Sequence, residues 1–265
     1  MKKCCCLFLA LLLCLMAVPA MAQTELVVFA AASMTESLNE IAKLYQKTAP
    51  DVTLVFNFDS SGTLKTQLVQ GADADVFISA GKKQMDELDI NADTEKNPEK
   101  LDMLLEKTRF DLLSNTVVLV VPKDAKSTIA NFEDVATDQV SLIALGNNDV
   151  PVGQYAKEVF TYLNLWEQLN TEGKITFASN VKEVLAQVES AAVDCGVVYI
   201  SDAATNDGVT VVASAPKGSH KPVNYPAAVM KSSKQPEAAK AFLEYLKGDE
   251  CKAVFEQIGF GVPER

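Results

Sequence analysis

The chain has 265 residues, of which 48% are hydrophobic and 22% charged, and its formal net charge at pH 7 is −11. This length suits one large domain or two of ordinary size. The acidic balance argues against binding to nucleic acid, whose partners concentrate positive charge, and against binding to an anionic membrane surface. The single histidine, His220, and the lack of a Cys-x-x-Cys motif argue against a zinc site.

Residues 1–22 have the features of a cleavable secretory signal peptide. Two lysines open this segment, an apolar run fills residues 4–18, and small residues end it. The run is shorter than the roughly 20 residues that a membrane-spanning helix needs. Cys14 follows a leucine rather than a small residue, so we expect no lipid anchor there. We therefore expect a soluble protein that is exported to the periplasm.

Four of the six cysteines lie in this leader, and Cys195 and Cys251 remain after it. An oxidising compartment permits a disulfide between them. Two cysteines do not make a disulfide framework, however, and buried free thiols are equally expected. The sequence leaves the state of these two residues open.

After the leader, short apolar runs alternate with amphipathic stretches, which indicates an α/β fold. Three apolar runs predict buried strands, at residues 26–29, 52–58 and 76–78. Helical spacing of apolar residues predicts a first helix, with Ser33 and Glu36 forming a capping box at its start. A second helix is expected to begin at Ser61. This order of strands and helices is typical of an open parallel sheet.

A polar surface excursion is expected at residues 89–100, and a second lobe after Asn115. The further elements predicted are strands at 116–121, 142–145, 197–200, 209–213 and 225–230, and helices at 152–162, from Asn180 onward, and through the C-terminal segment. We divide the chain into residues 23–110 for the first lobe, 111–214 for the second, and 215–265 returning to the first. The sequence thus predicts a two-lobed α/β protein.

Small or hydroxyl residues lead from a strand or loop into a helix N-terminus at four places. These are Ser33, Ser61–Gly62, Val152–Gly153 and Asn180–Val181. A helix N-terminus has unpaired N–H groups and a partial positive charge, so it can bind an anion. Ligands of open α/β sheets bind beyond the carboxyl ends of the strands, so we expect these junctions to meet at a cleft. Helix capping alone explains the same residues, and the pattern does not decide between the two explanations.

Six segments resemble the molybdate-binding periplasmic proteins of molybdate ABC transporters. They are FAAASMTESL (29–38), NFDSSGTLKTQLVQGADADVFISAG (57–81), VPVGQYAKEVF (150–160), GVVYISDA (196–203), NYPAAVM (224–230) and the closing IGFGV. The segments occur in the order of that family and span the chain after the leader. The resemblance implies a two-lobed periplasmic binding protein fold of type II, which closes around one tetrahedral oxyanion in the cleft between its lobes.

The resemblance also implies the residues that bind the anion. They are Ser33, Ser61, Val152, Val181 and Tyr199. The two serines and the tyrosine match positions that donate hydroxyl groups in the family, and the two valines match positions that donate backbone N–H groups. Hydrophobic periodicity gives no hint of the tyrosine. Gly62 departs from the family, because many relatives have a third serine there and only a backbone N–H is left as a donor.

A site made of donors without a cation suits molybdate, which is fully deprotonated near neutral pH. Phosphate has a proton that would need an acceptor. Sulfate, like molybdate, has no proton near neutral pH, so only the size of the cavity can reject it. Tungstate is nearly as large as molybdate and is expected to bind. The resemblance implies no cofactor and no ligands for a metal cation, since the molybdate oxyanion itself is bound through the five residues.

Two other classes of function remain open, an enzyme and a receptor for another anion. A serine hydrolase needs a base, yet His220 lies in a loop of Pro, Gly, Ser and Lys, and the G-x-S-x-G motif is absent from the sequence. A receptor for an organic anion usually has an arginine clamp, but Arg109 and Arg265 lie outside the six segments. Sulfate and phosphate receptors remain alternatives. We expect a binding protein rather than an enzyme, a monomer that delivers molybdate or tungstate to a membrane permease with a cytoplasmic ATPase.

Overall fold

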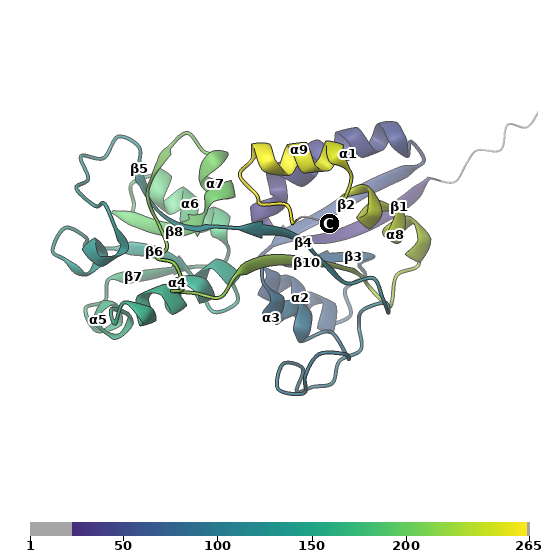
Figure 1. The fold of residues 1–265 in the computed structure, drawn as a ribbon, viewed down its shortest axis with the longest axis horizontal. Coiled ribbons are helices and arrows are strands. Elements are labelled where there is room, and N and C mark those ends of the chain that lie inside the picture. The colour runs from purple at the N-terminus through teal and green to yellow at the C-terminus, as the bar shows by residue number, and fades with distance from the viewer. Residues whose placement is uncertain (1–22, 264–265) are drawn as a thin grey trace, which may run out of the picture.

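The computed structural model describes residues 23–263, and the predicted signal peptide lies outside the described residues. The chain forms two lobes, each built on one five-stranded sheet with helices packed around it (Figure 1). This arrangement confirms the predicted two-lobed α/β fold. Within the described residues, no helix is long and apolar enough to cross a membrane.

The first lobe contains a mixed sheet with the strand order β2-β1-β3-β10-β4. Its strands are β1 (Thr24–Ala31), β2 (Val52–Asp59), β3 (Val76–Ile78), β4 (Phe110–Asn115) and β10 (Val223–Val229). Strands β2, β1 and β3 are parallel, as the sequence predicts, and β10 is antiparallel to both β3 and β4. A strand from the last fifth of the chain therefore lies inside the first sheet.

The second lobe contains a sheet with the strand order β7-β6-β8-β5-β9. Its strands are β5 (Val117–Pro122), β6 (Ile143–Gly146), β7 (Ile175–Ala178), β8 (Cys195–Tyr199) and β9 (Val209–Ser214). Every residue of β5 and β8 is buried, because helices cover both faces of this sheet. Continuous apolar runs were therefore the correct signal for these two strands.

Helices enclose both sheets. In the first lobe they are α1 (Thr35–Thr48), α2 (Ser61–Val69), α3 (Lys82–Asp86), α8 (Pro236–Tyr245) and α9 (Asp249–Gln257), and in the second lobe α4 (Pro151–Tyr162), α5 (Trp166–Thr171), α6 (Val181–Glu189) and α7 (Ile200–Ala204). Helices α1 and α9 lie on one side of the first sheet, and α2 and α3 lie on the other (Figure 1). Short 3-10 turns occur at Ala32–Met34 and Phe132–Ala136.

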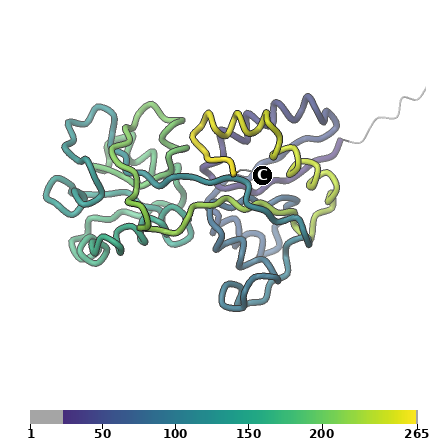
Figure 2. Tube along the Cα trace, in the orientation of Figure 1, coloured from purple at the N-terminus to yellow at the C-terminus, as the bar shows by residue number. Residues whose placement is uncertain are grey.

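Two segments connect the lobes and run side by side between them (Figure 2). The chain leaves the first sheet after β4 and enters the second with β5, and it returns between β9 and β10. Because β4 pairs with β10, the sheets divide a few residues later than the lobe boundary that we placed after residue 110. The boundaries of the lobes as folding units stay a prediction.

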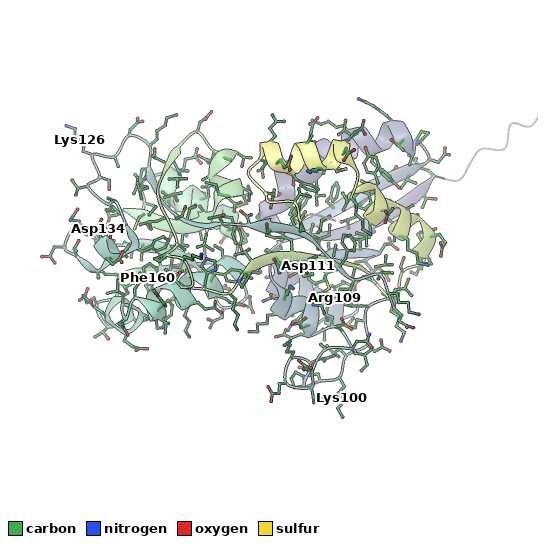
Figure 3. The ribbon with its side chains drawn as sticks, viewed as in Figure 1. Lys100, Arg109, Asp111, Lys126, Asp134 and Phe160 are labelled. Carbon is green, nitrogen blue, oxygen red and sulfur yellow. The ribbon has the colours of Figure 1, made fainter. Side chains whose placement is uncertain are left out.

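The polar segment that follows α3 extends away from the first lobe, with Lys100 at its far end (Figure 3). Arg109 anchors this excursion. Its guanidinium forms an ion pair with Asp86 in α3 and a second one with Asp89, where the nitrogen lies 2.8 Å from the carboxylate oxygen. Asn97 is buried inside the loop and bonds the backbone at Asp89 and Leu101. The predicted surface excursion is therefore present, held to its lobe by a half-buried arginine.

The predicted capping box at the first helix is wrong. Helix α1 begins at Thr35, after the 3-10 turn, and no side chain caps its N-terminus. The hydroxyl of Ser33 lies 2.9 Å from the phenol oxygen of Tyr225, and Glu36 forms an ion pair with Lys182 of the second lobe. Both side chains of the expected box therefore bind partners that are distant in the sequence.

Asn180 caps the N-terminus of α6. The Asn180 side chain accepts a hydrogen bond from the Glu183 N–H at 3.1 Å. The Glu183 carboxylate accepts a hydrogen bond from Ser179 N–H and not from Asn180 N–H.

The two cysteines are free and buried, and they lie in different lobes, Cys195 in β8 and Cys251 in α9. Burial raises the pKa of each thiol to about 12, so both stay protonated.

Candidate functional site

A narrow cavity of only about 10 Å³ lies between the two lobes. Residues at the ends of β1, β2 and β8 line it, together with the first residues of α2, α4 and α6. All five residues that the resemblance implies are in this lining, namely Ser33, Ser61, Val152, Val181 and Tyr199. The structure thus brings together residues that are up to two-thirds of the chain apart. That they bind an anion stays a prediction.

Ser61 is the first residue of α2 and is fully buried. Its oxygen accepts a hydrogen bond from the backbone N–H of Ala80 at 2.9 Å. Because the oxygen is already an acceptor there, the hydroxyl hydrogen remains for an acceptor in the cavity. The neighbouring Ser60 has the capping role, since its side chain accepts from Thr63 N–H at 3.1 Å.

Ser33 lies in the 3-10 turn that follows β1, and it is 3% exposed. Its oxygen is 2.9 Å from the phenol oxygen of Tyr225, and the Asn115 side-chain amide donates to the same phenol at 3.1 Å. Ser33 is therefore tied to β10 and to the end of β4, the two strands that lead into the segments between the lobes.

The second lobe contributes two helix N-termini to the cavity. Val152 is the second residue of α4 and Val181 is the first residue of α6. N–H groups in the first turn of a helix have no partner within the helix, and the helix dipole makes this end partly positive. Both valine side chains are buried. The backbone N–H groups at these two positions can therefore bind an anion.

Tyr199 is the last residue of β8, and it is 1% exposed. Its hydroxyl donates to the backbone oxygen of Ala80 in the first lobe, at 3.3 Å. Burial, with smaller contributions from the neighbouring Tyr225, Tyr155 and Asp202, raises the pKa of Tyr199 well above its usual value. The phenol therefore keeps its proton and remains a donor at neutral pH.

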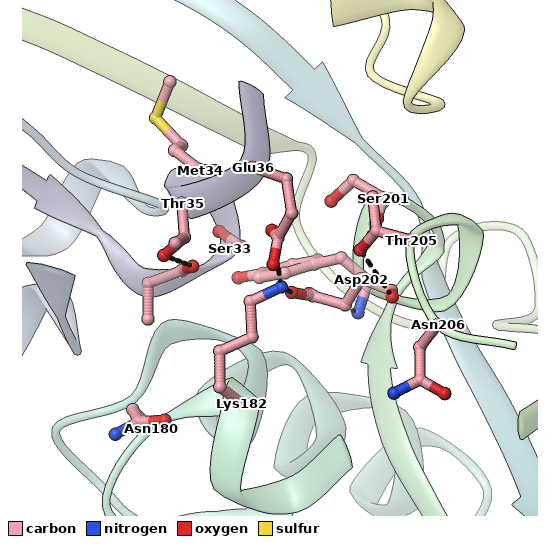
Figure 4. A network of polar contacts seen from close by, with 12 residues as sticks. Ser33, Met34, Thr35, Glu36, Asn180, Lys182, Ser201, Asp202, Thr205 and Asn206 are labelled. Carbon is pink, nitrogen blue, oxygen red and sulfur yellow. Dashed lines mark hydrogen bonds and ion pairs between the residues drawn. The ribbon is translucent and has the colours of Figure 1, made fainter. Parts of the chain in front are cut away.

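A half-buried ion-pair network crosses the cleft beside these residues (Figure 4). The Lys182 amine lies 2.7 Å from a Glu36 carboxylate oxygen in the first lobe and 3.2 Å from an Asp202 oxygen in the second. Burial alone would lower the pKa of Lys182, but Asp202 and Glu36 outweigh burial and raise it. Burial raises the pKa of Asp202 to about 6, and Lys182 offsets only part of that shift.

Sequence reasoning missed this network, although the sequence contains one signal of it. Lys182 follows directly after the start of α6, where the helix dipole disfavours a cation. A lysine at such a position indicates that a nearby carboxylate compensates its charge. Neither the position of Glu36, far earlier in the chain, nor that of Asp202 can be inferred without the fold.

Asp59 also lies in the lining, and it is the one charged residue among the described residues that line the cavity. One of its carboxylate oxygens accepts from the backbone N–H of Ser60 at 2.7 Å. The expected lining of donors without acceptors is therefore incomplete, because it omitted this carboxylate. Lys182 is not among the residues that line the cavity.

A further contact across the cleft involves Gly62. Its backbone N–H donates to the backbone oxygen of Asp149 in the second lobe at 2.9 Å. A Cβ atom at position 62 would lie 2.4 Å from that oxygen, closer than any van der Waals contact. Glycine at position 62 therefore allows the backbones of the two lobes to come close together here. Its N–H, which we expected to remain as a donor, is used by Asp149.

Comparisons with known proteins agree with this architecture. A family model for bacterial extracellular solute-binding proteins matches residues 26–261. The chain is 39% identical to the molybdate-binding protein ModA of Escherichia coli, over 90% of this chain and 89% of ModA. It is 38% identical to the putative ABC transporter substrate-binding lipoprotein YvgL of Bacillus subtilis, over 90% of this chain and 86% of YvgL.

A solved structure shows the same relationship. The substrate-binding domain of a putative molybdenum ABC transporter from Clostridium difficile superposes with a TM-score of 0.67 at 41% identity. The alignment covers 91% of this chain and the whole of that domain. The matched region includes both lobes and the cavity between them.

Proposed function

Because the chain belongs to the bacterial extracellular solute-binding proteins, in the group of the molybdate-binding periplasmic proteins, we propose that it binds molybdate between its lobes for import by an ABC transporter. The observation that carries the proposal is the meeting of Ser33, Ser61, Val152, Val181 and Tyr199 in one cavity between the lobes. The protein is a binding protein without a cofactor, and its ligand is the whole oxyanion.

The chemistry of the cavity supports this ligand. The two serine hydroxyl groups and the two helix N-termini are donors, and Tyr199 becomes a third hydroxyl donor when its hydrogen turns from the Ala80 oxygen to the anion. Molybdate presents four acceptor oxygens without a proton. Hydrogen bonds to a charged partner contribute about 1.5–3 kcal/mol each. Several such bonds, made in a cleft that excludes water, outweigh the cost of removing a dianion from water. Tungstate has nearly the same size and charge, so it binds as well.

We expect selectivity against smaller anions, because the bonds to their oxygens are shorter. Sulfate has shorter bonds to its oxygens, so it leaves some donors of one lobe unpaired at about 1–3 kcal/mol each. Phosphate near neutral pH has a proton that meets a donor at most positions of the lining. Asp59 is the described exception, and its carboxylate already accepts from Ser60. We therefore expect sulfate far behind molybdate, and phosphate last.

Location and partners follow from the family and the leader. We propose that the chain is exported through the signal peptide at residues 1–22, acts as a periplasmic monomer, and hands the anion to a membrane permease with a cytoplasmic ATPase. The net charge of −11 fits docking against basic patches of that permease. Nucleic acid plays no part in this function.

A ligand panel tests the proposal. Thermal unfolding of the chain without its leader is measured with molybdate, tungstate, sulfate, phosphate and citrate at equal ionic strength. A ligand that binds only the folded state raises the midpoint, by a free energy that grows with its concentration over Kd. We expect large shifts with molybdate and tungstate. Displacement of bound molybdate by sulfate or phosphate at comparable concentration would contradict the proposal.

A further inference from the structure

We propose that Tyr225 is a positioning residue, whose phenol donates to Ser33 and thereby directs the Ser33 hydroxyl hydrogen at the bound anion. The inference rests on the proposed function, because it assigns a role within the same site. Tyr225 itself lies outside the lining of the cavity. The resemblance to the molybdate-binding proteins implies no role for it.

The first step is the direction of the bond between Asn115 and Tyr225. The Asn115 side-chain oxygen accepts from Thr116 N–H at 2.9 Å, which fixes the orientation of the amide. Its nitrogen therefore faces Tyr225 at 3.1 Å and the Ser201 hydroxyl at 2.8 Å. An amide nitrogen can only donate, so the phenol oxygen of Tyr225 accepts from Asn115.

The second step is the direction of the bond between Tyr225 and Ser33, which are 2.9 Å apart. Either hydroxyl can donate in the absence of a ligand. Molybdate can only accept, however, so a Ser33 that binds it must donate its one hydrogen to the anion. The Tyr225 hydrogen then has Ser33 as its acceptor, and the chain of donors runs from Asn115 through Tyr225 and Ser33 to the anion.

The surroundings of Tyr225 support a fixed donor. The side chain is fully buried, and its ring packs edge-on against Tyr199 at 5.8 Å and Phe260 at 5.4 Å between centroids. Burial raises the pKa of the phenol well above its usual value, so it keeps its proton. Ser33 is only 3% exposed, so bulk water has little access to take the place of the phenol.

The other serine of the site has an equivalent arrangement. The Ser61 oxygen accepts from Ala80 N–H at 2.9 Å, so a backbone donor leaves its hydrogen for the cavity. Ser33 has a side-chain donor where Ser61 has a backbone donor. At both positions, therefore, the serine oxygen accepts a hydrogen bond from the protein, and the serine hydrogen is left to donate to the anion.

The test is a double-mutant cycle with Tyr225→Phe and Ser33→Ala, and molybdate affinity is the readout. Tyr225→Phe keeps the ring and removes the donor, while Asn115 retains its bond to Ser201. We expect Tyr225→Phe to weaken binding about 2- to 10-fold when Ser33 is present. In the Ser33→Ala background it has no further effect. Affinities too weak for calorimetry are read from the thermal shift at millimolar molybdate.

Tyr45→Phe is the matched control, because Tyr45 is a buried tyrosine of the same lobe that packs against Phe242 and Tyr245. It should leave affinity unchanged. Tyr225→Phe with normal affinity, or with the same loss in both backgrounds, would overturn the inference, since the second result indicates a general structural effect. A wild-type chain that fails to bind molybdate overturns the proposed function instead, and the inference with it.

Discussion

Adjacent serines at the start of α2 have different partners, and this difference gives a test of the site at the scale of single residues. Ser61→Ala should raise the Kd for molybdate about 5- to 150-fold, the effect of losing 1–3 kcal/mol. It should also lower the free energy of unfolding by about 1–3 kcal/mol, because Ala80 N–H loses its buried acceptor. Calorimetry and urea unfolding measure the two effects.

Ser60→Ala is the matched control for that substitution. It removes the cap of α2 and should lower the free energy of unfolding by about 1 kcal/mol, with a much smaller change in affinity. Equal losses of affinity in the two variants would mean that the helix start as a whole, and not the Ser61 hydroxyl, holds the anion.

Asp202 makes a prediction about pH. Its pKa is about 6 in the folded chain and near 3.9 in an unfolded one, so the folded state binds the proton more tightly. The stabilisation from this proton is therefore fully present below pH 4 and is lost as the pH rises through 6. From pH 7 to pH 5, the wild type should gain about 1 kcal/mol over Asp202→Asn.

Urea unfolding of both chains at the two pH values measures that difference, and the comparison cancels the titration of groups that the chains share. The groups facing Asp202 are Lys182 and Glu36, and Lys182 stays charged throughout this range. A stability difference between the two chains that does not change with pH would show that Asp202 titrates normally.

At the scale of elements, prediction from the sequence succeeded where a segment is defined by its own residues. The six apolar residues of β5 are buried on both faces and were found as one continuous run. Strand β4, with the sequence FDLLSN, was missed because only its two leucines are buried and its polar residues resemble a loop. Strand β7 was missed because it is short and mostly half-buried.

In the site, too, the sequence predicts features that are local and does not predict contacts that depend on the fold. Helix starts at Ser61, Val152 and Asn180 were visible as local patterns, and the structure has them within one residue of the expected positions. The partners of Ser33 and Glu36 were invisible, because Tyr225 and Lys182 are distant in the sequence. Hydrogen bonds that depend on the fold cannot be inferred from local spacing.

The start of α2 also sets how closely the lobes approach, and Gly62→Ala tests this. The added Cβ would lie 2.4 Å from the Asp149 oxygen, so the lobes must separate at this point. Overpacking of this kind costs about 1–3 kcal/mol, which predicts a roughly 5- to 150-fold loss of molybdate affinity. The measurement is calorimetry, with the thermal midpoint in the absence of ligand as the reference.

Gly71→Ala is a useful comparison, because Gly71 ends the same helix region in open space but at a positive φ of 93°. It should lower stability through backbone strain and leave affinity unchanged. If Gly62→Ala binds molybdate as tightly as the wild type, then closure does not depend on the contact with Asp149.

Across the molecule as a whole, the ion pair between Lys182 and Glu36 joins the two lobes. Lys182→Gln removes the pair with Glu36 and a positive charge beside the proposed anion site, and both losses weaken binding. We expect a loss of about 1 kcal/mol, roughly five-fold in Kd, that shrinks as salt is added. Titrations at low and high ionic strength measure it.

Lys43→Gln provides the control for net charge, since Lys43 pairs with Glu40 on the exposed surface of α1 within one lobe. It should change affinity little at either ionic strength. A Lys182→Gln chain that binds like this control would show that the cross-cleft pair makes no contribution to the closed state.

If the chain is exported as proposed, the position of β10 has a consequence for the order in which its two sheets form. Strands β3 and β4 have no direct pairing in the first sheet, because β10 lies between them. A polypeptide that emerges N-terminus first from a translocation channel delivers every strand of the second sheet before residues 223–229 arrive. The second lobe can therefore complete its sheet while the first waits for the end of the chain. The wall of the cavity that contains Ser33 and Ser61 belongs to the lobe that is finished last.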